Sequence, residues 1–278
     1  MVSQIKAGAI MSYISLFINI LLGIIYTPWM IRSIGVSDYG LYVLAMSVIT
    51  IFVFDFGLGS AVQRFVSKYL AEGRLDKVNK FLSVTYKLYI IADVVIFLFL
   101  FSVYFFIADI YQGLSPEELV KFKFIYAVVA IFSVFSFPFV LLDGTILAHE
   151  KFVQLKLCDL LHQIVIASSM TIFLYFGYGL YALVLVNVVS GIFRVVLKLI
   201  VLNRFTEVKI NWRYWDSSIL KAIIAFSMWV TIYAISQRAV LSSAPSILGI
   251  YYSSEYIALL GVAISVEGFF FIFANAIN

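Results

Sequence analysis

The chain has 278 residues, a net charge of +4, a hydrophobic fraction of 64% and a charged fraction of only 12%. Soluble domains average about 45–50% apolar and about 25% charged residues, so this composition excludes a soluble protein and predicts an all-α integral membrane protein. The single cysteine, Cys158, excludes an internal disulfide and a cysteine-based metal cage.

Long apolar segments follow one another along the chain, each long enough for a membrane-spanning helix of about 20 residues. The first is too long for the core of a signal peptide, and we expect it to be retained as a span. The predicted fold is therefore a polytopic helical bundle of about eight transmembrane helices. The segments cover residues 7–31, 39–63, 81–110, 123–148, 157–176, 179–203, 220–248 and 255–278.

The basic residues predict the orientation of this bundle, because Lys and Arg gather in cytoplasmic loops. With the N-terminus inside, only Arg32, Lys121 and Lys123 fall in outer loops. The inner set is much larger, so the sequence predicts a cytoplasmic N-terminus. It comprises Lys6, Arg64, Lys68, Arg74, Lys77, Lys80, Lys151, Lys156, Lys198, Arg204, Lys209, Arg213 and Lys221.

Two connections between the spans carry local signals. Ser115, followed by Pro116 and two glutamates, predicts a capped helix start on the outer side. Residues 204–220 are polar, basic and aromatic, and they contain Asp216, which we expect to cap the next span. Because aromatic rings beside basic residues suit the headgroup region, we predict that this segment is a cytoplasmic interfacial linker between two lobes.

The segment after the linker repeats the start of the chain at an offset of 217 residues. We therefore expect a six-helix N-terminal lobe at residues 1–203 and the first two helices of a second lobe at residues 221–278. The second copy stops at Asn278, before a basic exit, so we expect a truncated chain or a fragment. The matching pairs are Pro28 with Pro245, Ser37 with Ser254, Asp38 with Glu255 and Tyr39 with Tyr256.

The stretch at residues 35–73 carries a family resemblance. It reads Gly-x-Ser-x-Tyr-Gly-x-Tyr, then Asp-Phe-Gly-Leu-Gly-Ser-Ala at the end of the second span, then Arg-x-x-Ser-Lys-Tyr. This order resembles the second helix of bacterial polysaccharide export proteins, the lipid-linked oligosaccharide flippases of the MATE-like (MOP) superfamily. The motif residues are Gly35, Ser37, Asp38, Tyr39, Gly40, Tyr42, Asp55, Phe56, Gly57, Leu58, Gly59, Arg64, Ser67, Lys68 and Tyr69.

The resemblance implies a multi-pass protein of the bacterial inner membrane. It implies a flippase that moves a polyprenyl-pyrophosphate-linked oligosaccharide to the outer leaflet, for O-antigen, lipopolysaccharide or capsule synthesis. Two lobes would rock around a central cavity, as in other transporters built from repeats. The implied partners are the lipid-linked oligosaccharide, membrane lipids and polysaccharide polymerase or assembly proteins, with no nucleic acid and no cofactor.

Charges inside the spans are the candidate functional residues, because a charge at a helix centre costs about 2.5–3.5 kcal/mol on insertion. Arg238, Arg194 and Lys87 are candidates for binding the pyrophosphate, since Arg donates paired hydrogen bonds to phosphate. Asp93 and Glu267 are candidates for ion coupling or for pairing inside the bundle. A structural alternative pairs Arg238 with Glu267 and lets Lys87 extend to the membrane interface.

The motif residues have a structural interpretation. We expect Gly57 and Gly59 to allow close helix packing, and Asp55 to cap a helix or to pair near Arg64. Asp38, Tyr39 and Gly40 belong to the same structural set.

Other function classes stay open. No ATP-binding loop, catalytic motif or metal cluster is visible, which favours a transporter over an enzyme. A MATE-type drug or cation antiporter should have an acidic, aromatic cavity, and an inactive or scaffolding membrane fragment is compatible with the end at Asn278. A membrane glycosyltransferase is disfavoured, because no loop offers a sugar-nucleotide site.

Overall fold

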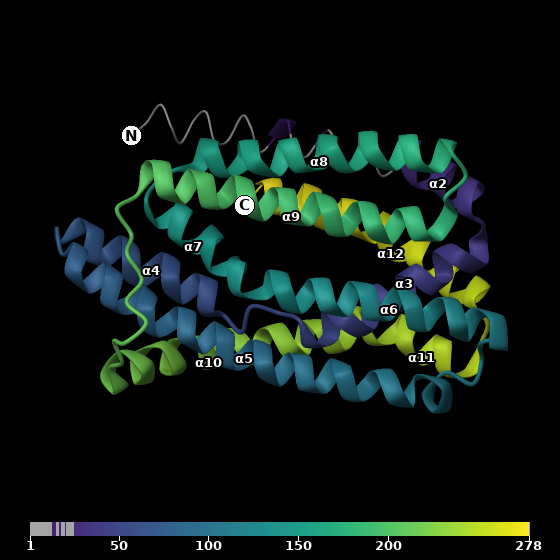
Figure 1. Cartoon of the computed structure of the whole chain (residues 1–278), viewed down its shortest axis with the longest axis horizontal. Helices are drawn as coiled ribbons and strands as arrows, with labels where there is room; N and C mark the ends of the chain where they lie inside the picture. The colour runs from purple at the N-terminus through teal and green to yellow at the C-terminus, as the bar shows by residue number, and fades with distance from the viewer. Residues whose placement is uncertain (1–12, 15–16, 18–19, 21–24, 278) are drawn as a thin grey trace.

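The computed structural model describes residues 13–14, 17, 20 and 25–277, which leaves most of the first predicted span outside the described residues. Throughout the described part the regular structure is helical, as predicted (Figure 1). The elements are α2 (Thr27–Ile34), α3 (Val36–Phe52), α4 (Leu58–Ala71), α5 (Leu75–Ile110), α6 (Pro116–Ser136), η2 (Phe137–Val140), α7 (Leu141–Ala148), α8 (Phe152–Tyr175), α9 (Gly179–Phe205), α10 (Ser217–Leu241), α11 (Ser243–Tyr251) and α12 (Ser254–Ile277).

Five helical stretches in the described part are long and apolar enough to cross a membrane. They are α5, α6 to α7, α8, α9, and α10 to α11; the pair α2 and α3, bent by 114°, makes a sixth if it counts as one span. Large apolar side chains such as Phe101, Ile164 and Val189 are exposed on the outer faces of these helices. A surface of this kind suits lipid rather than water, which confirms the predicted class of polytopic helical membrane protein.

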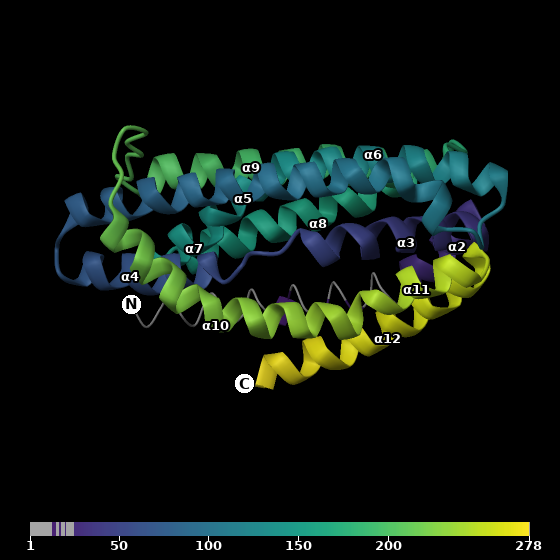
Figure 2. The ribbon, with the colours of Figure 1, turned by 90° about the horizontal axis from the view of Figure 1, so that it is seen from below.

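The helices run along one long axis and alternate in direction (Figure 1, Figure 2). The connections α4–α5, α7–α8 and α9–α10 lie at one end, which we call the basic end because it holds Arg74, Lys151, Lys209 and Arg213. The connections α5–α6, α8–α9 and α11–α12 lie at the other end, which we call the Ser115 end. The three connections at the Ser115 end, residues 111–115, 176–178 and 252–253, contain no Lys or Arg, so the charge of the connections differs between the two ends.

The predicted second span at residues 39–63 is not one continuous helix. It ends as α3 at Phe52 and resumes as α4 at Leu58. Phe56 and Gly57 have φ angles of +51° and +70°, so the backbone leaves the right-handed helical region there. Asp55 stabilises the break, because its Oδ2 accepts the backbone N–H of Gly59 at 2.8 Å in the first turn of α4.

Two predicted helix starts are confirmed in detail. Ser115 Oγ accepts the backbone N–H of Glu118 at 3.4 Å, and the Ser115 N–H donates to Glu118 Oε2 at 2.9 Å, which completes a capping box. Asp216 caps α10 by accepting the backbone N–H of Ser218 at 2.8 Å. The irregular linker between α9 and α10 spans residues 206–216, because α9 continues to Phe205.

The core lies where α3, α5 and α6 meet. Leu41, Leu44, Tyr89, Phe122 and Tyr126 are almost fully buried there. The Tyr126 hydroxyl donates to the carbonyl of Leu100 at 2.9 Å, which satisfies its polar atom inside the apolar core. This core holds α3 at the centre of the bundle, with α6 on one side and α12 on another.

The helices α11 and α12 match α2 and α3 at the offset of 217 residues seen in the sequence. In each pair a short helix that contains a proline precedes a break and then a long helix. The two long helices, α3 and α12, pack against each other. The contact is so close that a Cβ on Gly40 would lie only 1.9 Å from the carbonyl oxygen of Ser254.

Candidate functional site

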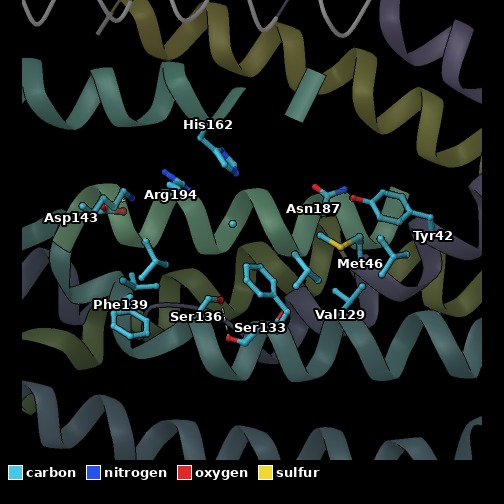
Figure 3. Close-up of a pocket in the computed structure, with 17 residues that line it drawn as sticks. Tyr42, Met46, Val129, Ser133, Ser136, Phe139, Asp143, His162, Asn187 and Arg194 are labelled. Atoms are coloured by element: carbon cyan, nitrogen blue, oxygen red, sulfur yellow. Dashed lines mark hydrogen bonds and ion pairs between the residues drawn. The ribbon is translucent and has the colours of Figure 1, made fainter. Parts of the chain in front are cut away.

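A cavity of about 260 Å³ lies among α3, α6, η2, α7, α8 and α9 (Figure 3). Asp143 and Arg194 lie at the side nearer the basic end, and Lys198 pairs with Asp143 there. His162 also lines the cavity. The rest of the wall is formed by Tyr42, Met46, Val129, Phe132, Ser133, Ser136, Phe139, Val140, Val184, Asn187, Val188, Gly191 and Val195.

Two cations and two carboxylates form a continuous ion-pair network at the charged side of the cavity. Arg194 donates to Asp159 Oδ1 through Nε at 2.9 Å and through Nη2 at 2.6 Å. Lys198 is bonded to Asp143 and lies 3.9 Å from the same Asp159 oxygen. Only 6% of the Lys198 side chain is exposed. The formal charges cancel, which lowers the cost of holding four charged groups in the bundle.

Local helix geometry places these groups. Arg194 and Lys198 are four residues apart on α9, so their side chains share one face. Asn187 lies two turns earlier on the same face, and Figure 3 places it at the far side of the cavity from Asp143. The cavity therefore runs from a charged side to a polar and aromatic side within a single helix bundle.

The network determines what the cavity can bind. An anion that approaches Arg194 has to compete with Asp159, which already holds both the Nε and Nη2 groups. A proton or a small cation could instead add to the carboxylates of Asp143 or Asp159. His162 lines the same cavity.

The three predicted phosphate-binding residues do not form one site in this structure. Lys87 on α5 donates to the carbonyl oxygen of Tyr214 at 2.8 Å, and its Nζ lies 5.8 Å from the ring centroid of Trp215. Arg238 lies near the far end of α10, about 30 Å along the helix from the linker at 1.5 Å per residue. Arg194 faces the cavity on the other side of α3.

The predicted coupling residues lie outside the network. One carboxylate oxygen of Asp93 is buried with no hydrogen-bond partner. Glu267 is exposed on α12. The alternative pairing of Arg238 with Glu267 is not formed: within the described residues, no ion pair joins them.

The motif residues make structural contacts. Asp38 pairs with Lys121 at 2.8 Å, Tyr39 is buried, and Asp55 also accepts a hydrogen bond from the Tyr89 hydroxyl. The guanidinium of Arg64 lies 4.9 Å from the ring centroid of Phe226 on α10 rather than on Asp55.

Three of the motif glycines, Gly40, Gly57 and Gly59, lie at close helix contacts. A Cβ on Gly57 would lie 2.6 Å from Val230 on α10. The carbonyl oxygen of Gly59 would lie 2.7 Å from a Cβ on Gly144 of α7, and Gly40 faces Ser254.

The sequence reasoning missed Asp159. Its partner Arg194 is 35 residues away, so no local spacing connects them. A usable signal was depth: Asp159 begins the predicted span 157–176 and Arg194 is near the end of span 179–203, which places both near the same membrane face.

A family model described as "Polysaccharide biosynthesis protein" matches residues 29–277 of the chain. The match covers α2 to α12 and all of the cavity. No curated protein matches the chain, and no solved structure matches it.

Proposed function

We propose that this chain, which belongs to the polysaccharide biosynthesis protein family, is a membrane transporter that flips a polyprenyl-pyrophosphate-linked oligosaccharide. The family match over residues 29–277 carries the proposal. The helices that are long and apolar enough to cross a membrane support a transport function within the bilayer. The direction of transport would be from the cytoplasmic to the outer leaflet of a bacterial inner membrane.

The segregation of charge supports this orientation. Arg74, Lys151 and Arg213 lie at the basic end, and cytoplasmic loops are enriched in such residues. The basic end would face the cytoplasm, where it also attracts an anionic pyrophosphate head. The Ser115 end would face outward.

The mechanism we propose uses the two copies of the repeat. The copy that contains α11 and α12 would rock against the N-terminal lobe, with the substrate between them. Arg238 would meet the pyrophosphate from the second copy, because no carboxylate in the described part pairs with it. The lipid tail would stay in the bilayer.

The cavity network would act as the responsive element of the N-terminal lobe. Arg194 would exchange its bond to Asp159 for a phosphate oxygen, or a proton would neutralise one carboxylate. Either event leaves one partner unpaired in a site of low dielectric, which changes the relative stability of the two lobe positions.

A second candidate function is drug or cation antiport. The carboxylate of Asp143 and the aromatic rings of Tyr42, Phe132 and Phe139 line one cavity, which favours this function because such a cavity suits an organic cation. The two functions differ in substrate charge, so they can be separated by experiment.

The test is complementation of a bacterium that lacks its oligosaccharide flippase but still makes the repeat unit. The chain is expressed within its natural reading frame, and surface polysaccharide and the lipid-linked precursor are both quantified. Restored surface glycan supports the flippase, and Arg238→Ala should then lower it. If several repeat units fail while resistance to cationic drugs rises, the antiporter replaces the flippase.

A further inference from the structure

The carboxylate of Glu118 joins two helices from different copies of the repeat at the Ser115 end. Ser37 Oγ on α3 donates to Glu118 Oε1 at 2.9 Å, and Ser254 Oγ on α12 is bonded to the same oxygen. The two serine oxygens are themselves 2.8 Å apart. One carboxylate oxygen and two hydroxyls thus form a single compact junction.

The second oxygen of Glu118 holds the carboxylate in place. Glu118 Oε2 accepts the backbone N–H of Ser115 at 2.9 Å as part of the capping box of α6. The side chain is therefore fixed by its own helix before it reaches α3 and α12. Preorganisation of this kind lowers the entropy lost when the junction forms.

Close backbone contacts surround the junction. Ser254 is fully buried, its carbonyl lies over Gly40, and the N–H of Gly113 donates to the carbonyl of Ile250 at 3.1 Å. The turn between α11 and α12 is thus held against both α3 and the α5–α6 connection. No side chain larger than hydrogen fits at Gly40 without separating α3 from α12.

The tight contact is confined to this end of α12. Ile257, Ala258 and Gly261 are buried, whereas Val262 and Glu267, farther from the junction, are exposed. Figure 2 shows α12 diverging from α3 toward its C-terminal end. The junction therefore holds the Ser115 end of the two helices together while they separate farther along.

We propose that Glu118, Ser37 and Ser254 form a latch that closes the Ser115 end between the two copies and releases once per transport cycle. This proposal rests on the proposed transport function. Hydroxyl–carboxylate bonds suit a latch because water can replace each of them when the helices part. A buried apolar contact has no such replacement.

The first experiment measures opening without any substrate. Ala258, buried in the α3–α12 contact, is changed to Cys in a Cys158→Ser background, and the purified chain in nanodiscs is labelled with a maleimide. Glu118→Ala should raise the labelling rate by about tenfold, the effect of losing a charge-assisted hydrogen bond. Glu117→Gln should leave the labelling rate unchanged, because Glu117 is the neighbour of Glu118 in the chain and makes no bond to Ser37 or Ser254.

The second experiment closes the latch covalently. Ser37→Cys and Ser254→Cys are combined in the Cys158→Ser background, and an added oxidant should join the two cysteines in a disulfide. Neither cysteine should then react with a PEG-maleimide under denaturing conditions. Oxidised protein should label slowly at Ala258→Cys even with Glu118→Ala present, and reductant should restore the fast rate. Each variant is labelled only after it has been shown to be monodisperse, so misfolded protein does not contribute to either measurement.

The latch is overturned if Glu118→Ala labels at the parent rate, or if the two cysteines do not join. It is also overturned if complementation stays complete with the disulfide formed. Failure of complementation in the parent chain, with labelling behaving as expected, would instead remove the flippase and keep the latch. The two proposals therefore fail separately.

Discussion

The side-chain oxygens of Ser37 and Ser254 lie 2.8 Å apart, although 217 residues separate them in the chain. These residues match at the offset of 217 residues seen in the sequence, one at the start of α3 and the other at the start of α12. If the two segments are copies of one repeat, as we propose, a residue that contacts its own equivalent lies near the axis that relates them, as at an isologous interface. The crossing of α3 and α12 at the Ser115 end is therefore where the two segments meet most closely.

The closeness of this crossing can be tested at Gly40. A Cβ there would lie 1.9 Å from the Ser254 carbonyl oxygen, and a backbone atom cannot move aside as a flexible side chain can. Gly40→Ala should lower the free energy of unfolding by about 1–3 kcal/mol, measured by thermal unfolding in detergent.

Gly268→Ala on α12 is the matched control for Gly40→Ala. A Cβ at Gly268 would meet no atom within 4 Å. Alanine is the better helix former, so this variant should be neutral or slightly stabilising. Equal losses from the two variants would show that α3 and α12 are not in close contact.

The break between α3 and α4 makes a second prediction. Gly57 has a φ of +70°, and a Cβ on it would lie 2.6 Å from Val230 on α10. Gly73 has a φ of +68° with no atom within 4 Å of its Cβ position. Gly73→Ala should cost only the left-handed penalty of about 1–2 kcal/mol, whereas Gly57→Ala should cost about 1–3 kcal/mol more.

A second substitution identifies the cause of that difference. Val230→Gly should recover part of the loss in Gly57→Ala, because it removes the Val230 Cβ and Cγ1 atoms, which would lie 2.6 Å and 2.9 Å from the new Cβ. It should recover nothing in Gly73→Ala. If Gly57→Ala and Gly73→Ala lose the same stability in chemical denaturation, α10 does not pack on the break.

The class of fold and the two helix caps could be predicted because their causes are local. Apolar length defines a span, and Ser115 with Glu118, or Asp216 with Ser218, forms a cap within four residues. The break at residues 53–57 could not be predicted in the same way. The carbonyls of Phe56 and Gly57 at this break accept hydrogen bonds from the hydroxyls of Thr231 and Ser227, which are about 170 residues away in the chain.

The candidate site was harder to predict for a similar reason. The position of a charged residue within a predicted span indicates its depth in the membrane, but not which neighbouring helix its side chain faces. Lys87, Arg194 and Arg238 were therefore grouped by type, whereas the structure directs Lys87 to the linker and Arg194 to Asp159. The partner of Arg194 lies on a neighbouring helix, and only the packing of α8 against α9 reveals it.

The ion-pair network predicts a charge effect at Lys198. Lys198→Met leaves Asp143 without its partner, which should lower the free energy of unfolding by about 2 kcal/mol. The loss should stay below the ~3–5 kcal/mol of a fully buried pair, because the Asp143 side chain is 37% exposed. Adding Asp143→Asn should recover most of it. If the double variant is less stable than Lys198→Met alone, the two residues do not form a pair.

The last prediction concerns the linker, which is held along α5 by a series of contacts. Its backbone N–H groups at Lys209 and Asn211 donate to Asn79 and Ser83, each at 2.8 Å. Lys87 completes the series with its bond to the Tyr214 carbonyl. Lys87→Met should release the linker near Arg213 and raise the rate of tryptic cleavage there by about tenfold, the effect of one lost charge-assisted hydrogen bond.

The control for Lys87→Met is Lys68→Met, which removes an exposed lysine of α4 whose 4.0 Å pair with Glu72 should contribute little. Cleavage of this control should match the parent, as followed by gel analysis of the two fragments. Lys87 has a second possible role, in binding the pyrophosphate. If Lys87→Met abolishes surface glycan while Arg213 is cut at the parent rate, Lys87 acts on the substrate and the linker contact is incidental. If cleavage accelerates and glycan export falls together, the linker is the element through which Lys87 acts, because its release uncouples α10 from α5.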